Sequence, residues 1–350
     1  MPKGSNAALI LIAGCSLIAL LSYGSAVIAP VIFALFIIIL VWPLQRILSS
    51  VLSRYLALVI TFLLVVLLLL GFGWLIAWTV GQIGRRILID AARYQLLYEQ
   101  LRIWLDAHGI AVSVLWSDNF SVSWALRNLQ SIGSRLNNTF SFWLVALVYV
   151  LLGLAETDEF NSRIKRLKNQ TSADTFVRGC RVAAAKIRHY MLLRAAMSLV
   201  TGLFVWVFTR FIGLPFSTTW GFVAFILNFI PFVGPLAATL FITAFAFTQL
   251  AVWQSVLAIF VGLNVIQSVI GSILEPRLAG STLSLSPVAV LFSVFAWGAL
   301  WGVFGAFIGV PITIVLLTFS AQHPATSWFA EIFGFPPEQK LEREERPSLQ

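Results

Sequence analysis

Long apolar runs separated by short basic segments dominate this chain. The uncharged runs cover residues 4–45, 55–84 and 136–155. A fourth stretch, residues 195–330, contains only three charged side chains, which are Arg210, Glu275 and Arg277. Because about 20 helical residues cross the hydrocarbon core of a bilayer, each run is long enough for at least one crossing. The pattern predicts an all-α, polytopic membrane protein.

Composition agrees with this class. Hydrophobic residues make up 59% of the chain and charged residues 11%, whereas about 25% charged residues is typical of a soluble domain. The first apolar run continues past Pro30 to Pro43 without a convincing cleavage site. We therefore interpret it as membrane helix and not as a cleaved signal peptide.

The sequence lacks the motifs of enzymes and metal sites. It has no Ser/His/Asp set, no HExxH and no Walker motif, so we expect neither catalysis nor ATP-driven transport on this chain. The three histidines stand alone, and Cys15 and Cys180 lie in unlike contexts. We expect no metal site, no disulfide and no cofactor.

The net charge of +9 is concentrated in one segment. Residues 156–194 carry nine Lys or Arg side chains against four acids. Such a bias is typical of a cytoplasmic loop that faces anionic lipid. We interpret these basic residues as topology markers, and we expect membrane lipid, not nucleic acid, as a partner.

With this basic segment in the cytoplasm, both termini are predicted to be cytoplasmic. The predicted segments, in order, are three transmembrane helices in 1–80, an extracytoplasmic helical segment in 81–138, a transmembrane helix in 139–155, a basic cytoplasmic loop or helix in 156–194, a C-terminal transport core in 195–330 and a disordered cytoplasmic tail in 331–350. The extracytoplasmic segment has an apolar stripe at helical spacing, formed by Ile87, Ala91, Tyr94, Tyr98, Leu101 and Leu105. The stripe predicts contact with a neighbouring subunit, packing within the chain, or contact with lipid.

Two long apolar segments of the C-terminal core are interrupted near their middles. Residues 217–250 are broken by Pro231 and Gly234, and residues 288–320 are broken by a series of glycines. Each segment is too long for one upright span and short for two. Paired interruptions of this kind indicate the binding region of a secondary transporter. We expect either re-entrant hairpins, belonging to two inverted repeats, or ordinary paired spans.

Polar residues near these interruptions are the candidates for a substrate or ion path. The first interruption combines Asn228, Pro231 and Gly234. A proline frees the carbonyl four residues earlier, and a free carbonyl at membrane depth needs protein or a watery cavity to satisfy it. The interruption therefore predicts either a polar binding region or a purely structural kink.

A second set of candidates lies on residues 253–274 and just beyond. Asn264 and Gln267 share one helix face that leads toward Glu275. The two amides predict either a lining for a polar substrate or hydrogen bonds between helices. Glu275 predicts either a proton or cation site, or a salt bridge with Arg277 at a cytoplasmic helix end.

Glycines of the second interrupted segment form two small-xxx-small pairs. The pairs are Gly298 with Gly302, and Gly305 with Gly309. Such spacing lets two helices approach closely. We expect these four residues to serve helix packing.

Several of these motifs, taken together, resemble the AI-2E family of membrane proteins. The resemblance rests on FILNFIPFVG at 225–234, ILEPRLAG at 273–280, LSLSP at 283–287, FAWG at 295–298, WGVFG at 301–305 and VPIT at 310–313. It extends over nearly the whole chain and is sharpest from about residue 185 onward. Pro235 stands where the family's exporter of autoinducer-2 tends to have a small polar residue.

The resemblance implies about eight membrane segments, a bacterial inner membrane and homo-oligomers, with the pentamer as the expected size. It implies a secondary transporter that exports a small polar metabolite, with autoinducer-2 as the first candidate and Na+(Li+)/H+ exchange as the alternative. Asn228, Asn264 and Gln267 would bond a neutral polyol, and Glu275 would exchange a proton for a cation. A membrane scaffold or regulator without transport activity is a third interpretation.

The inverted arrangement of the two interrupted segments is testable by cysteine labelling. Single cysteines at Gly213 and Gly280, in a background without Cys15 and Cys180, should react with a membrane-impermeant reagent from opposite sides. Labelling of both positions from the same side would exclude inverted repeats.

Overall fold

The chain is built from helices throughout the part that its computed structural model describes. That part comprises residues 3–90, 141–156, 170–250, 252–279, 285–323 and 326–334, with a few single positions between 93 and 108. Within it, five helices are long and apolar enough to cross a membrane, namely Ser25–Val51, Arg54–Arg86, Ala173–Phe211, Trp253–Leu278 and Pro287–Gln322. Shorter apolar helices accompany them. The prediction of an all-α, polytopic membrane protein is confirmed.

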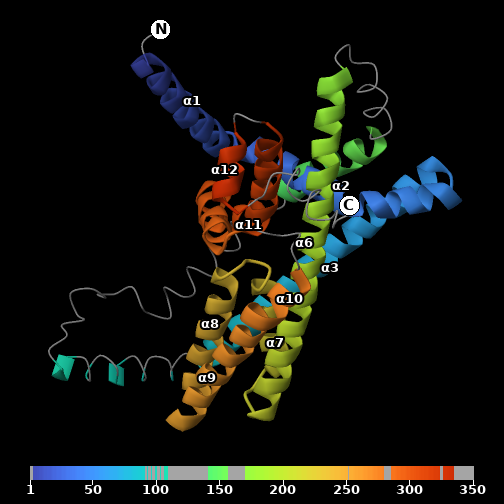
Figure 1. The fold of residues 1–350 in the computed structure, drawn as a ribbon. Helices are drawn as coiled ribbons and strands as arrows, with labels where there is room; N and C mark the ends of the chain where they lie inside the picture. The colour runs from blue at the N-terminus through green and yellow to red at the C-terminus, as the bar shows by residue number, and fades with distance from the viewer. Residues whose placement is uncertain are drawn as a thin grey trace, which may run out of the picture. The chain divides into compact units, whose positions relative to one another are not determined.

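The helices divide into two compact units, and several of them are labelled in Figure 1. Unit 1 holds α1 (Lys3–Tyr23), α2 (Ser25–Val51), the start of α3 (Arg54–Ile89), the helix Ser141–Glu156, the start of α6 (Gln170–Phe211), α11 (Pro287–Gln322) and α12 (Ser327–Ile332). Unit 2 holds the remainder of α3 and α6, with α7 (Ser217–Leu227), α8 (Val233–Gln249), α9 (Trp253–Val269) and the π-helix η2 (Ile270–Leu274). The short helix α10 (Glu275–Ala279) follows η2.

α6 is one helix of 42 residues. Two other helix boundaries differ from those expected. α3 continues to Ile89, past the predicted end at residue 80. α12 extends to Ile332, into the segment predicted to be a disordered tail. The helix is anchored there, because the amide of Ser286 donates to the carbonyl of Phe333 at 3.1 Å. Most of the apolar stripe predicted on residues 87–105, and the tail beyond residue 334, lie outside the described residues.

An aromatic cluster joins three helices of unit 1. Phe33 of α2 lies within 6.2 Å, between ring centroids, of Phe142, Trp143 and Phe304. Phe142 and Phe304 stack at 4.5 Å. Offset and edge-to-face contacts of this kind each add about 0.5–1.5 kcal/mol beyond the area they bury. The cluster joins α2 to the helix Ser141–Glu156 and to the second half of α11.

The second interrupted segment folds as a helical hairpin within α11. Trp301 and Gly302 leave the helical region, and Gly302 has φ +65° and ψ −145°, a conformation nearly confined to glycine. Beyond this reversal the two halves pack closely. A Cβ at Gly305 would collide with the carbonyl of Trp297, and one at Gly309 would lie 2.8 Å from the carbonyl of Ser293.

The glycines of this hairpin therefore do different work. Gly298 faces Ala306, and Gly305 and Gly309 allow the close approach of the two halves. Gly302 has no neighbour within 4 Å of an added Cβ. Its positive φ makes it the reversal point of the hairpin.

The core of unit 2 lies among α6, α7, α8 and α9. Buried members of this core include Val205, Trp220, Ile242, Phe245 and Leu263. Helices α8 and α9 lie side by side, as Figure 1 shows. Two glycines bring α6 and α7 together, because a Cβ on Gly202 would lie 2.8 Å from the carbonyl of Gly221.

The close packing inside α11 predicts the effect of a single methyl group. Gly305→Ala should lower the stability of the purified protein by about 1–3 kcal/mol, because the added carbon meets backbone that cannot move away alone. Gly71→Ala is the matched control, since nothing lies within 4 Å of a Cβ at that helical position. Thermal unfolding in detergent measures both, and equal midpoints for the two variants would contradict the packing described.

Candidate functional site

The tip of the α7–α8 hairpin in unit 2 is the most distinctive backbone feature near the predicted polar path. Helix α7 ends at Leu227 and α8 begins at Val233, so the interruption covers residues 228–232. Asn228 is buried, and its side-chain amide donates to the hydroxyl of Ser198 on α6 at 3.3 Å. The polar group at the tip is thus directed into the protein and tied to a neighbouring helix.

The carbonyls that the prolines leave without helical donors find partners inside the tip. The carbonyl of Leu227 accepts from the amide of Ile230 at 2.9 Å, and that of Pro231 accepts from Val233 at 2.6 Å. At membrane depth such groups must be satisfied by protein or by water. Here the chain satisfies both by turning tightly, which is why the interruption is compact.

This tight turning places Phe232 in a strained conformation. Its φ is 59° and its ψ is −53°, and the bond from Val233 to Pro231 closes a γ-turn around it. A γ-turn with positive φ is rare and strained, and a residue held in a sparsely populated region costs about 1–3 kcal/mol. Such strain occurs preferentially at binding sites and switch regions. The observation marks the hairpin tip as a candidate functional element.

Gly234 and Pro231, the other two tip residues singled out in the sequence, are both buried. A Cβ at Gly234 would collide with the carbonyl of Leu227. The glycine is therefore required where α8 begins against the end of α7. Both residues shape the backbone of the tip, and Asn228 supplies its side-chain polar group.

Phenylalanine rings pack beside the tip. Phe229 lies 5.4 Å from Phe225 and 6.1 Å from Phe72 of α3, measured between ring centroids, and both contacts are edge-to-face. The buried Asn228–Ser198 pair thus belongs to a largely apolar region. A few polar groups in apolar surroundings are typical of small-molecule sites.

The second group of candidate residues lies on α9 and its continuation. The amide of Asn264 donates to the carbonyl of Phe260 in its own helix at 2.7 Å, and Gln267 is half-buried. The hydrogen bond of Asn228 goes to α6 and that of Asn264 stays within α9, so neither bond joins the two groups. The structure places them in one unit without connecting them directly.

Helix α9 ends in a π-helix that leads to Glu275. Residues Ile270–Leu274 form η2, and π-helical turns inside α-helices occur frequently at functional sites. Glu275 is half-buried at the start of α10, and Arg277 is exposed. Glu275 is the last residue of unit 2, and Arg277 belongs to unit 1.

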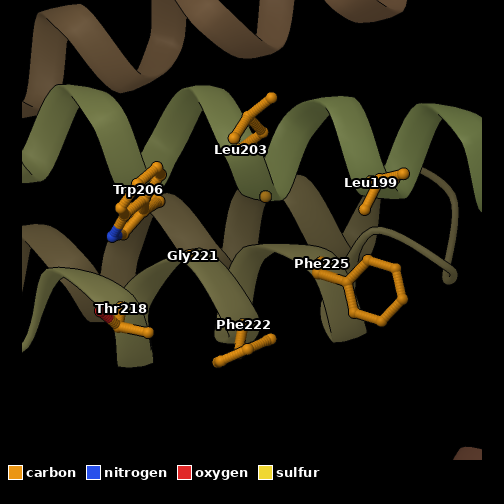
Figure 2. Close-up of a pocket in the computed structure, with 8 residues that line it drawn as sticks. Leu199, Leu203, Trp206, Thr218, Gly221, Phe222 and Phe225 are labelled. Carbon is orange, nitrogen blue, oxygen red and sulfur yellow. The ribbon is translucent and has the colours of Figure 1, made fainter.

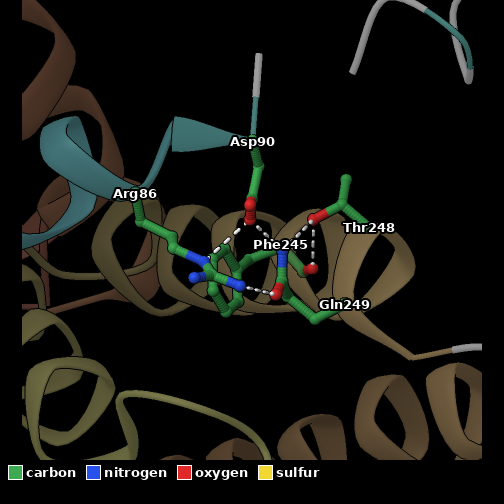
Figure 3. A network of polar contacts seen from close by, with 5 residues as sticks. All are labelled: Arg86, Asp90, Phe245, Thr248 and Gln249. Carbon is green, nitrogen blue, oxygen red and sulfur yellow. Dashed lines mark hydrogen bonds and ion pairs between the residues drawn. The ribbon is translucent and has the colours of Figure 1, made fainter. Parts of the chain in front are cut away.

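A polar network that the sequence did not reveal joins the end of α3 to the end of α8 (Figure 3). Nε of Arg86 lies 2.7 Å from the carboxylate of Asp90. Gln249 connects the two, because its carbonyl oxygen accepts from Arg86 at 2.9 Å and its amide donates to Asp90 at 2.8 Å. The Arg86 guanidinium also lies 5.9 Å from the ring centroid of Phe216.

The network holds its residues in one arrangement. Only 15% of the Asp90 side chain is exposed, and charge-assisted hydrogen bonds are about twice as strong as neutral ones. Thr248 accepts from Gln249 at 3.3 Å and donates to the carbonyl of Phe245 at 2.7 Å. The i,i+4 spacing of Arg86 and Asp90 was visible in the sequence, but the partner 163 residues away was not.

The Arg86–Gln249 contact predicts a measurable coupling. In a double-mutant cycle, Arg86→Ala and Gln249→Ala should show a coupling free energy of about 0.5–3 kcal/mol, because each removes the other's partner. The same cycle with the exposed neighbour Arg85→Ala should be additive. Chemical unfolding in detergent supplies the free energies, and additivity in both cycles would contradict the network.

Comparison with known proteins adds an independent line of evidence. The profile of the AI-2E family transporter matches residues 7–324. The chain is 27% identical over 296 residues to the AI-2 transport protein TqsA of Escherichia coli K12, covering 84% of this chain and 85% of that protein. It is 34% identical over 143 residues to YhhT of the same organism, whose name marks it as a candidate transport protein, covering 40% of each chain. A candidate transport protein of Haemophilus influenzae is 24% identical over 349 residues, covering 95% of both chains.

Proposed function

Because the chain belongs to the AI-2E family of transporters, we propose that it exports a small polar metabolite across the bacterial inner membrane. Autoinducer-2 is the first candidate substrate, and the similarity to an AI-2 transport protein supports this choice. The proposal includes cytoplasmic termini and a homo-oligomer, with a pentamer as the expected size. Family membership favours transport over a scaffold or regulatory role.

The hairpin tip is the observation that carries the proposal. A buried amide and hydroxyl, Asn228 and Ser198, lie beside a strained turn in apolar surroundings. A neutral polyol needs donors and acceptors to replace its hydrogen bonds to water, since an unmade bond costs about 1–3 kcal/mol when buried. An amide and a hydroxyl supply both kinds of group without a net charge.

In the proposed mechanism, the substrate competes for the hydrogen bond between Asn228 and Ser198. In the observed arrangement the Asn228 amide bonds Ser198, so a substrate hydroxyl must compete with that bond. Asn264 and Gln267 supply further amides along α9. We assign to the tip the first contact with the substrate and to α9 the continuation of its path.

Export is testable in cells and in inverted vesicles. Cells lacking the protein should accumulate internal autoinducer-2, and the wild-type chain should restore its release. Asn228→Ala should lower the initial rate about fivefold or more, because one buried hydrogen bond contributes about 1 kcal/mol. Ser198→Ala should also slow export.

Ser293 is the matched control for Ser198. It separates an effect at the proposed site from the effect of losing any buried hydroxyl. Ser293→Ala removes an equally buried hydroxyl that bonds only its own helix, through the carbonyl of Ala289, and should export normally. Equal rates for the Ser198→Ala and Ser293→Ala variants, together with a normal Asn228→Ala variant, would refute the proposed site.

Glu275 supports the alternative function of cation–proton exchange. It follows a π-helix and is the one acidic residue of residues 195–330, and intramembrane carboxylates commonly mark proton or cation pathways. Sodium-driven proton movement in inverted vesicles, lost in Glu275→Gln and kept in Glu331→Gln, would establish this alternative. Glu331 is a suitable control because it is exposed on α12.

A further inference from the structure

An apolar groove lies between α6 and α7 in unit 2 (Figure 2). None of the residues assigned to the polar transport path lines it. Its volume is about 340 Å³, within the range of small-molecule sites. Four residues of α6 line one side, namely Leu199, Gly202, Leu203 and Trp206. Four residues of α7 line the other, namely Thr218, Gly221, Phe222 and Phe225.

The groove exists because two glycines meet at its floor. A Cβ on Gly221 would lie 2.9 Å from the carbonyl of Gly202, so the two backbones approach without side chains between them. Larger side chains stand on either side of this crossing. Leu199 and Leu203 are 64% and 53% exposed, so the groove opens to the outside of unit 2.

Apolar surface lines the whole groove. Leu199 and Phe225 lie at one end of it, and Trp206 and Thr218 lie at the other (Figure 2). Helix α7 begins beside Thr218, and its N-cap residue Phe216 provides no capping hydrogen bond. Tryptophan is enriched where hydrocarbon meets the polar headgroups.

A cation lies beyond the Trp206 end of the groove, on the same face of α6. Leu199, Leu203, Trp206 and Arg210 follow one another at spacings of four, three and four residues, which places them on one face of α6. Arg210 is exposed in the last turn of the apolar span Ala173–Phe211. No hydrogen bond or ion pair of its guanidinium with the described residues is present. It is also the one charged side chain of residues 195–274.

The length of this face matches one leaflet of a bilayer. Eleven residues separate Leu199 from Arg210, which corresponds to about 16 Å along a helix. Half of a hydrocarbon core measures about 15 Å. An acyl chain that lies in the groove therefore has its headgroup at the level of Arg210.

From this geometry we propose that the α6–α7 groove is a binding site for one anionic glycerophospholipid. An acyl chain occupies the hollow above Gly202 and Gly221, and the phosphate pairs with Arg210. Trp206 and Thr218 contact the glycerol region between them. An anionic lipid is favoured over a zwitterionic one, because a basic residue near the surface contributes about 1 kcal/mol with anionic lipid.

Native mass spectrometry of the full-length protein tests the site. The protein in detergent is titrated with phosphatidylglycerol and, separately, with phosphatidylcholine of identical chains. Wild-type protein should retain one phosphatidylglycerol per chain and should bind it more tightly than phosphatidylcholine. Arg210→Gln should weaken phosphatidylglycerol binding about fivefold. It should weaken phosphatidylcholine binding less, because the choline ammonium already offsets the charge of the phosphate. Arg178→Gln, an exposed arginine of the same helix, should change neither.

Substitutions that fill the groove with a larger side chain test whether an acyl chain binds there. Leu203→Trp should weaken binding of both lipids, whereas Leu192→Trp, at an exposed position of α6 away from the groove, should have no effect. Leu199→Trp replaces Leu203→Trp if the latter fails to fold. The proposal is overturned if the Arg210→Gln and Arg178→Gln variants behave alike, or if the filled groove binds lipid normally.

A second copy of the chain is the competing occupant. A single cysteine at Leu203, in a background without Cys15 and Cys180, distinguishes the two cases in membranes. Efficient disulfide-linked dimers would show that another subunit covers the groove and would overturn the lipid site. Absence of dimers, with quenching of a fluorophore at position 203 by lipid brominated along its chain, is the expected result.

Discussion

The need to satisfy every backbone polar group at membrane depth is the constraint on which this structure depends. Continuous helices satisfy their backbone groups with their own hydrogen bonds. At two interruptions in the described residues, other donors satisfy the carbonyls. At residues 228–232, the carbonyls of Leu227 and Pro231 accept bonds from amides two or three residues further on. At the end of α1, the carbonyl of Leu21 accepts from the indole of Trp301 at 2.9 Å. The first solution uses backbone amides, and the second uses the side chain of a distant residue.

Much of the fold could be predicted from the sequence, because apolar runs of sufficient length have few alternatives in a bilayer. The interruption near Pro231 was predictable for the same reason, since proline removes a donor wherever it stands. The polar network at the end of α3 was not predictable, because Gln249, which bonds Arg86 and Asp90, lies far away in the chain.

The candidate site was predictable in its residues but not in its contacts. Asn228 was identifiable as a polar residue beside a break, but nothing marked Ser198 as its partner, because a serine in a membrane helix commonly bonds its own backbone. Likewise, spacing alone could not separate Gly302 from Gly305. Both belong to small-xxx-small pairs, yet one supplies a positive φ and the other a close approach.

The γ-turn at Phe232 holds backbone strain at the hairpin tip. Its strain persists because contacts on both sides hold it, namely the Asn228–Ser198 bond and the close approach of Gly234 to Leu227. A ligand that takes the place of Ser198 therefore removes one of the restraints that keep Phe232 under tension. Under the proposed function, such a ligand would leave the close approach of Gly234 to Leu227 as the remaining restraint on the turn that begins α8.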